Sequence, residues 1–167
     1  KSKDTYITTE VGQHQMFSCN YYKFEEPGRW ISSGGLGTMG FGLPAAIGVQ
    51  IAHPKSTVCC IAGESSFMMN VQEVATAVQH QLPIKVMILN NNYMGMVRQW
   101  QELLYDKRYS ESYLAALPDL VKLVEAFGAQ GAKVEKPAEL DAAIKKMLAA
   151  KGPYFLTVAI DPDENCF

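Results

Sequence analysis

Two polar clusters, each placed directly after an apolar, β-branched run, constrain the fold of this chain more than any other feature. The run at residues 57–62 is followed by Gly63 and Glu64, and the run at residues 84–89 is followed by three asparagines. Apolar side chains recur at helical spacing between the two runs, which predicts a strand, a helix and a strand. A crossover of this length is right-handed and makes its strands parallel. Both polar clusters should therefore emerge at the same, carboxyl edge of a sheet, where ligands of open α/β sheets bind.

The remaining segments continue this alternation and predict an α/β fold, a three-layer sandwich whose mostly parallel sheet is flanked by helices. We expect strands at residues 5–8, 29–32, 57–62, 84–89, 130–134 and 154–160. We expect helices at residues 12–22, 43–51, 67–78, 94–100, 118–127 and 137–150. Asn70 and Glu73 have the spacing of a capping box in the third of these helices, and Pro118 would occupy the first turn of the fifth.

The composition excludes several classes of protein. With 167 residues, 48% of them hydrophobic, the chain has the length of a single domain with a substantial core, residues 1–167. Its net charge of −2 and its lack of a basic run argue against nucleic acid as a partner. No apolar run approaches the roughly 18 residues of a membrane span, so we expect no membrane partner, and the first residues show no apolar leader.

The four cysteines form no CxxC pair. This favours a reducing, intracellular compartment, namely the cytoplasm, or a plastid or mitochondrion in a eukaryote. Cys59 and Cys60 are neighbours in a predicted strand, so they should point to opposite faces of the sheet as small, buried apolar side chains.

Gly35, Gly37 and Gly40 match the spacing of the dinucleotide-binding fingerprint, and Glu64 lies about where a ribose-binding acid would follow. A nicotinamide dinucleotide-binding domain is therefore an alternative interpretation. We rank it second, because further glycines flank the motif, the strand before it is weak, and it leaves the asparagine cluster without a role.

Gln13 and His14 follow the first predicted strand and begin the first helix. For an isolated pair of this kind we favour a capping or solvent-exposed role. The alternative is donation to an anionic group at the positive end of the helix. The polar clusters of the crossover point to such an anion, because a carboxylate and a carboxamide side by side would suit a hard cation that carries phosphates.

Most of the chain resembles one family, the carboxyl-terminal, pyrophosphate-binding domain of the large catalytic subunit of acetohydroxyacid synthases (acetolactate synthases), which are thiamin diphosphate enzymes. The resemblance covers residues 8–16, 21–24, 33–48, 63–70, 90–102 and 161–167. The segment from Met94 to Gln101 is similar to this enzyme in particular rather than to thiamin enzymes at large. A related thiamin enzyme acting on 2-oxo acids is the second interpretation within this resemblance.

The resemblance implies a cofactor site. Mg²⁺ would be held by Glu64, the side-chain oxygen of Asn91 and the main-chain carbonyl of Tyr93. The family binds thiamin diphosphate through residues that correspond here to Gln13, His14, Gly37, Met39, Gly63, Ser65, Ser66, Met94, Gly95 and Met96. The pocket for substrate and for herbicide-type inhibitors would be lined by Met96, Val97 and Trp100.

The implied reaction is the thiamin diphosphate- and Mg²⁺-dependent decarboxylation of pyruvate and its carboligation to pyruvate or 2-oxobutyrate, which begins branched-chain amino-acid synthesis. In the family, a pyrimidine-binding (PYR) domain of a partner subunit supplies the catalytic glutamate, and a middle domain holds FAD; neither fits within this chain. We therefore expect no catalytic residue here and no turnover by the chain alone. The implied partners are a second subunit, in a homodimer or higher oligomer, and a regulatory subunit. A non-catalytic thiamin-binding or assembly module is the third interpretation.

The chain departs from the family at one metal ligand, because the family has Asp where Glu64 stands. Mg²⁺ demands near-octahedral geometry at roughly 2.0–2.1 Å. The extra methylene should therefore weaken the binding of metal and cofactor without abolishing it.

Overall fold

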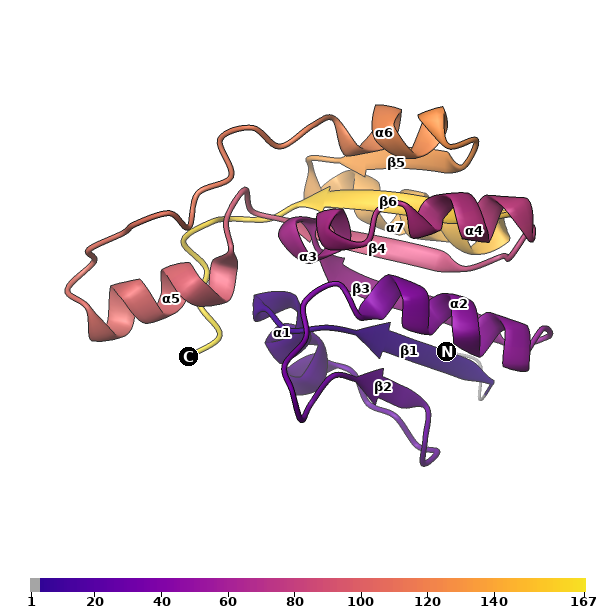
Figure 1. Cartoon of the computed structure of the whole chain (residues 1–167), viewed down its shortest axis with the longest axis horizontal. Coiled ribbons are helices and arrows are strands. Elements are labelled where there is room, and N and C mark those ends of the chain that lie inside the picture. Colours follow the sequence, from indigo (N-terminus) through magenta and orange to yellow (C-terminus); the bar gives the residue numbers. More distant parts are fainter. Residues whose placement is uncertain (1–3) are drawn as a thin grey trace.

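Six parallel strands form the central layer of the computed structural model, which describes residues 4–167 (Figure 1). The strands are β1 (Thr5–Thr9), β2 (Trp30–Ser32), β3 (Thr57–Gly63), β4 (Lys85–Asn90), β5 (Gln130–Val134) and β6 (Tyr154–Ala159). Their order across the sheet is β2-β1-β3-β4-β6-β5. Every neighbouring pair is parallel, which confirms the predicted α/β sandwich.

Helices cover both faces of this sheet. They are α1 (Gln13–Tyr21), α2 (Gly42–Ala52), α3 (Glu64–Met69), α4 (Glu73–Gln79), α5 (Gly95–Leu104), α6 (Leu120–Ala126) and α7 (Pro137–Ala149). The first face carries α2, α3, α4 and α6, and α7 packs on the second face beside the end of α1. Figure 1 shows α5 apart from these layers, beyond the carboxyl ends of the strands and next to the C-terminus.

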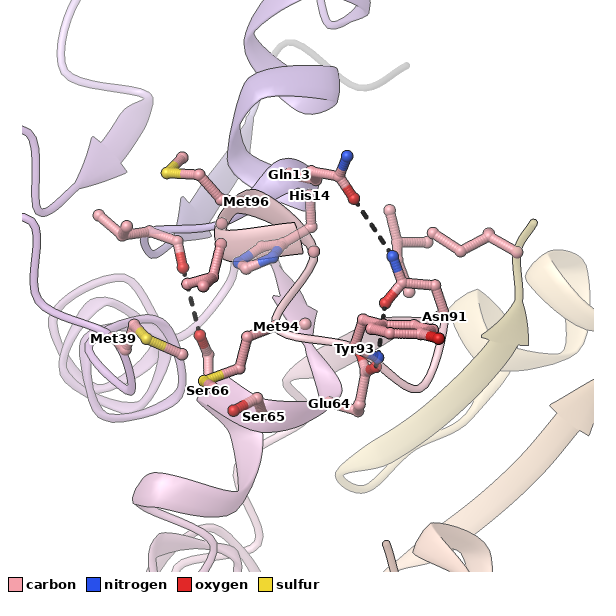
Figure 2. Close-up of a pocket in the computed structure, with 17 residues that line it drawn as sticks. Gln13, His14, Met39, Glu64, Ser65, Ser66, Asn91, Tyr93, Met94 and Met96 are labelled. Atoms are coloured by element: carbon pink, nitrogen blue, oxygen red, sulfur yellow. Dashed lines mark hydrogen bonds between the residues drawn. The ribbon is translucent and has the colours of Figure 1, made fainter. Parts of the chain in front are cut away.

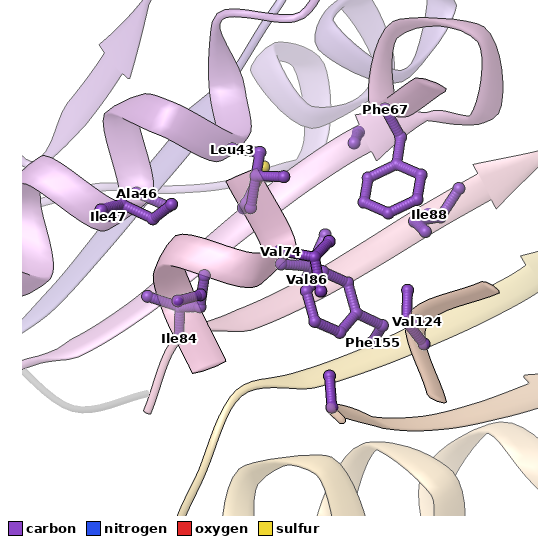
Figure 3. Packing of buried hydrophobic residues seen from close by; sticks show 14 of the residues in the cluster. Leu43, Ala46, Ile47, Phe67, Val74, Ile84, Val86, Ile88, Val124 and Phe155 are labelled. Carbon is purple, nitrogen blue, oxygen red and sulfur yellow. The ribbon is translucent and has the colours of Figure 1, made fainter. Parts of the chain in front are cut away.

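The alternation of side chains in β4 explains why the sheet needs a cover on each side. Val86 and Ile88 are fully buried in the core of the first face (Figure 3), whereas Met87 and Leu89 pack against the core of the second. A central parallel strand is buried on both faces and is therefore apolar throughout. On the first face the rings of Phe67 and Phe155 pack at an angle of 55° with their centroids 5.7 Å apart, which fixes α3 over β6.

Lys85 is the exception in this apolar strand. Its side chain is 4% exposed, and its ammonium donates hydrogen bonds to the carbonyl oxygens of Ala150 (2.7 Å) and Gly152 (2.9 Å). These carbonyls follow the last turn of α7, where a cation is favoured by the helix dipole. Burial nevertheless lowers the pKa of Lys85 below its usual value.

The crossover between β3 and β4 contains two helices, so the prediction of one continuous helix over residues 67–78 was wrong. The chain leaves the helical conformation at Asn70 (φ −133°, ψ 32°). The capping box was wrong as well, because α4 has no side-chain cap and its N-cap position is Gln72. The carboxamide of Asn70 instead donates to the carbonyl oxygen of Gly40, 2.8 Å away, and ties the glycine-rich loop to the break between α3 and α4.

Two predicted helix boundaries also moved. The helix expected to begin at Pro118 begins at Leu120, because the carboxylate of Asp119 accepts hydrogen bonds from the backbone N–H groups of Val121 and Lys122. Pro118 therefore precedes the cap instead of lying in the first turn. The helix expected at residues 94–100 continues as α5 to Leu104.

The second face of the sheet is only partly covered. A groove of about 650 Å³ lies between the end of α1 and α7, and its floor includes Ile61 and Met87. Cys59 lines this groove, while Cys60 is fully buried on the first face, as the alternation in β3 predicts. Burial raises the pKa of the Cys59 thiol to about 11.

None of the helices in residues 4–167 combines the length and the apolar character that a membrane crossing requires.

Candidate functional site

The two polar clusters meet at the carboxyl edge of the sheet, as the crossover predicts. Gly63 at the end of β3 pairs with Leu89 near the end of β4, so Glu64 and Asn91 follow neighbouring strands. The backbone N–H of Tyr93 lies 3.0 Å from Glu64 Oε1 and 3.0 Å from Asn91 Oδ1, and it donates to both. Two side-chain oxygens from different strands are thereby held against one amide.

Glu64 is a buried carboxyl group that forms no ion pair within residues 4–167. Its side chain is 2% exposed, and burial raises the pKa of the carboxyl from 4.5 to about 7. Hydrogen bonds from the backbone N–H groups of residues 64 and 91–93 lower the pKa but do not outweigh burial. A neighbouring cation would favour the ionised form and lower this pKa.

The oxygen donors around Tyr93 fit a magnesium ion better than a transition metal. Among residues 4–167, no three His, Cys, Asp or Glu side chains gather as a metal site built from those residues would require. The donors here are one carboxylate and one carboxamide oxygen, and hard, oxygen-preferring cations such as Mg²⁺ suit this set. The raised pKa of Glu64 agrees with a site that lacks a nearby positive charge.

These donors form one wall of a cavity at the sheet edge. Its volume is about 80 Å³. The structure brings together around it the predicted site residues Gln13, His14, Met39, Gly63, Glu64, Ser65, Ser66, Asn91, Tyr93, Met94, Gly95, Met96 and Val97. Figure 2 shows Glu64, Asn91 and Tyr93 on one side, with Met39 and Ser66 on the other.

Two predicted site residues lie outside the lining of this cavity. Gly37 has a positive φ of 68°, and it approaches the lining residue Val11 instead of the cavity itself. Trp100 points to the C-terminus, where its ring centroid lies 5.8 Å from that of Phe167. Sequence analysis also missed four lining residues: Val11, Gly12, Leu89 and Ile160.

Gln13 and His14 are buried, with side chains 4% and 6% exposed, so the preferred capping or solvent-exposed role was wrong. The N-cap position of α1 is Gly12, and no side chain caps this helix. The carboxamide of Gln13 accepts a hydrogen bond from Asn91 (3.2 Å) and donates one to Gln99 of α5 (3.0 Å). Gln13 therefore connects the candidate metal ligands to α5.

The last seven residues, which we call the C-terminal strap (residues 161–167), complete this network. Gln13 also donates to the carbonyl oxygen of Glu164, 3.1 Å away. The backbone N–H of Cys166 donates to the buried carboxamide oxygen of Gln99 (2.8 Å), and the guanidinium of Arg98 contacts Asp163. The strap thus holds α5 beside α1, although α5 does not pack on the sheet.

Gly95, the first residue of α5, makes the close approach of α5 to Gln13 possible. A methyl group at this position would collide with the side-chain oxygen of Gln13 and lie 2.9 Å from the side-chain nitrogen of Asn91. Both side chains are buried and hydrogen-bonded to each other, so neither can move aside without breaking that bond. Only glycine fits beside the network.

The glycine-rich segment does not have the geometry of a dinucleotide fingerprint. It follows β2, a three-residue strand at the edge of the sheet, whereas the fingerprint opens a central βαβ unit. Gly34 and Gly35 have no neighbouring atoms that a side chain would meet, so close backbone approach does not require them.

Comparison with known proteins agrees with this geometry. Residues 10–158 match the family described as thiamine pyrophosphate enzyme, C-terminal TPP binding domain. The chain is 49% identical over 167 residues to the acetolactate synthase isozyme 3 large subunit of Escherichia coli K12 and 50% identical over 165 residues to the isozyme 2 large subunit. It is 47% identical to the acetolactate synthase large subunit of Porphyra purpurea. These matches cover 98–99% of this chain but only 28–30% of the length of the relatives.

Proposed function

Because this chain belongs to the thiamine pyrophosphate enzymes, as their C-terminal TPP-binding domain, we propose that it is the cofactor-binding part of an acetolactate synthase. The observation that carries the proposal is the pair of oxygens from Glu64 and Asn91 that share the Tyr93 N–H at the mouth of the cavity. The proposed reaction joins decarboxylated pyruvate to a second 2-oxo acid, either pyruvate or 2-oxobutyrate.

Mg²⁺ would be held by the carboxylate of Glu64, the side-chain oxygen of Asn91 and the main-chain carbonyl of Tyr93. Both side-chain oxygens lie 3.0 Å from the backbone nitrogen of Tyr93, so two of the proposed ligands are close to the third residue before a cation binds. The cation would also stabilise the ionised form of Glu64, which burial disfavours.

The diphosphate of the cofactor would lie at the positive end of α1, against His14, and near Ser65 and Ser66 in the first turn of α3. Gly63, Met94, Gly95 and Met96 would approach the cofactor with backbone and apolar atoms. Met39, in the glycine-rich loop, would support the aminopyrimidine of the cofactor. Gly37, in the same loop, would contribute to this support from outside the cavity lining. Met96, Val97 and Trp100 are the proposed substrate pocket, and Trp100 would enter it only if the strap released its ring.

Bound thiamin diphosphate supplies the carbanion chemistry of such a reaction. The described residues would bind and orient it, and apolar residues such as Met96 and Val97 would exclude water from one side. Val97 lines the cavity and is 41% exposed, which is consistent with a site that a second surface closes.

The rest of the enzyme would provide that second surface. We propose a PYR domain of a partner subunit with the catalytic glutamate, a middle domain that holds FAD, and a homodimer or larger oligomer with a regulatory subunit. The chain spans less than a third of the length of its acetolactate synthase relatives, which is room for such domains. A cytoplasmic location, or a plastid or mitochondrial one in a eukaryote, stays a prediction.

The test is a calorimetric titration of thiamin diphosphate into the 167-residue chain, with Mg²⁺ and with EDTA, beside Glu64→Asp. Mg²⁺-dependent binding by the natural chain, tightened by Glu64→Asp, is the expected result, because the shorter acid restores the family's ligand. If neither chain shows a heat of binding at millimolar cofactor, a preformed site is contradicted. Binding of NADH without Mg²⁺ would favour the dinucleotide alternative instead. Binding without turnover after addition of a PYR-containing partner would favour a non-catalytic module.

A further inference from the structure

Glu10 is a buried acid that the proposed cofactor site does not use. It follows β1, its side chain is 1% exposed, and one carboxylate oxygen accepts a hydrogen bond from the backbone N–H of Gly42 (2.5 Å). Gly42 is the first residue of α2, so the carboxylate lies at the positive end of that helix. The other oxygen, Oε1, is buried and has no hydrogen-bond partner among residues 4–167.

The unpartnered oxygen faces an equally unpartnered nitrogen. His14 Nε2 is buried, makes no hydrogen bond to any part of the chain that the structure describes, and lies 3.4 Å from Glu10 Oε1. Buried polar atoms are nearly always paired, and a charge-assisted N–H···O contact is about 2.7–2.9 Å long. A rotation that closes the gap by roughly half an ångström would therefore satisfy both atoms with one hydrogen bond.

The opposite nitrogen of the ring lies beside two glycines that line the cavity, Gly12 and Gly63. A methyl group on Gly63, which lines the cavity, would lie 2.7 Å from His14 Nδ1. The imidazole therefore lies between the buried carboxylate of Glu10 and the candidate ligand site. Figure 2 shows His14 among the residues that line the cavity.

We propose that Glu10 is a positioning residue for His14: it accepts the Nε2–H proton and so fixes the ring with Nδ1 toward the cavity. A neutral ring in this state presents a lone pair at Nδ1, and a second proton converts Nδ1 into a donor. Glu10 compensates the positive charge that this second proton brings. The step transfers one proton from a hydronium ion of the solvent to the Nδ1 lone pair, which forms the Nδ1–H bond and releases a water molecule.

This arrangement has a consequence for ligand binding that rests on the proposed function. An anionic diphosphate at Nδ1 would hold the second proton, so the ring would bridge two anions through two N–H donors. The other ionisable groups around the pair are Cys60 of β3, whose pKa is raised well above its usual value by burial and further by the charge of Glu10, and Glu64 of α3 across the cavity.

Glu10→Gln replaces the carboxylate by an amide of nearly the same volume, so it tests the role of the acceptor oxygens without changing the packing. Gln has one acceptor oxygen, and the N–H of Gly42 needs it, so the amide NH₂ must face His14 Nε2. Two donors cannot pair, and the ring therefore has to move its proton to Nδ1. The substitution should switch the tautomer of His14 without removing any packing.

The ligand-free chain tests the pairing by ¹⁵N NMR of labelled histidine at one fixed pH. We expect a protonated Nε2 in the natural chain, an unprotonated Nε2 in Glu10→Gln, and recovery in Glu10→Asp, which keeps the charge. An unprotonated Nε2 in the natural chain overturns the proposal, and that measurement needs no variant. A tautomer that Glu10→Gln leaves unchanged overturns it too.

The affinity for thiamin diphosphate with Mg²⁺ tests the consequence. We expect Glu10→Gln to weaken binding roughly tenfold, since a charge-assisted hydrogen bond becomes a neutral one. Glu73→Gln, which changes an acid on α4 that accepts a hydrogen bond from Thr76 and lies outside the cavity lining, should leave the affinity unchanged. A switched tautomer with unchanged affinity would refute the positioning role. Failure of the natural chain to bind at all would count against the proposed function, while the ligand-free tautomer would still decide the pairing.

Discussion

Replacing Glu64 by Gln should stabilise the metal-free chain at alkaline pH. The folded-state pKa of Glu64 is raised from 4.5 to about 7, so between these values the folded chain holds a proton that the unfolded chain has released. The free energy of unfolding therefore falls as the pH rises through this window and levels off above it. A shift of this size corresponds to about 3 kcal/mol, because each pH unit contributes about 1.4 kcal/mol. Gln cannot ionise and can still accept the hydrogen bond of Tyr93.

The assay is urea unfolding followed by circular dichroism at a series of pH values from 4.5 to 8.5, with EDTA. The difference in unfolding free energy between Glu64→Gln and the natural chain is the quantity to plot, since other carboxyl groups cancel in it. Glu102 and Glu135, whose pKa values are lowered by their neighbours, Asn165 and Lys133 first, are common to both chains. We expect the difference to grow by about 3 kcal/mol in favour of the variant.

A difference that stays flat between pH 4.5 and 7, or that grows in favour of the natural chain, would refute the assignment of a raised pKa to burial. Glu73→Gln serves as the matched control, because its acid lies outside the cavity. Adding Mg²⁺ should shrink the difference at pH 8 by stabilising the ionised acid of the natural chain only. No effect of Mg²⁺ would count against the cation site but not against the effect of burial.

The remaining predictions concern packing and the polar network. Phe155→Ala should lower the free energy of unfolding by about 3–5 kcal/mol in urea, because it empties a site in the core against Phe67, whereas Leu36→Ala, at a side chain 95% exposed, should change it little. If the two substitutions lowered the free energy of unfolding equally, the placement of Phe155 in the core would be contradicted. Gly95→Ala should weaken cofactor binding about tenfold in calorimetry by displacing Gln13, with Gly34→Ala, whose surroundings are open, as the control. Removal of residues 164–167 should weaken binding in the same titration, and an unchanged affinity would show that the strap does not support Gln13.

The sheet and the edge where the cavity lies could be predicted from sequence, because they depend on local patterns. The run 84–89 has the apolar character of a strand buried on two faces, and its crossover from the run 57–62 fixes the direction of both strands. The order of the strands could not be predicted, since it depends on contacts between segments far apart in the chain. The burial of Lys85 could not be predicted for the same reason. Its ammonium donates a hydrogen bond to a carbonyl oxygen just after α7, 65 residues away.

The errors at the site have the same physical origin. Asn70 has the right spacing for a local cap, but a carbonyl in the glycine-rich loop, 30 residues away, binds its carboxamide. Gln13 looks exposed at a helix start because its cover, α5 and the strap, follows much later in the chain. His14 is covered instead by Glu10 and by Gly63 at the end of β3. The contact between Glu10 and His14 had one signal in the sequence that could have predicted it. An acid and a histidine four residues apart flank a glycine just after a predicted strand.

The network around Gln13 makes the end of the chain and the cavity parts of one equilibrium. One carboxamide contacts Asn91 beside the candidate cation site and Glu164 in the strap. Thermodynamic reciprocity then requires that any factor by which a docked strap raises the affinity of the cavity for its ligand is the factor by which the ligand tightens the strap. A molecule that captures residues 161–167 would consequently act on the cavity as a competitor does, without entering it.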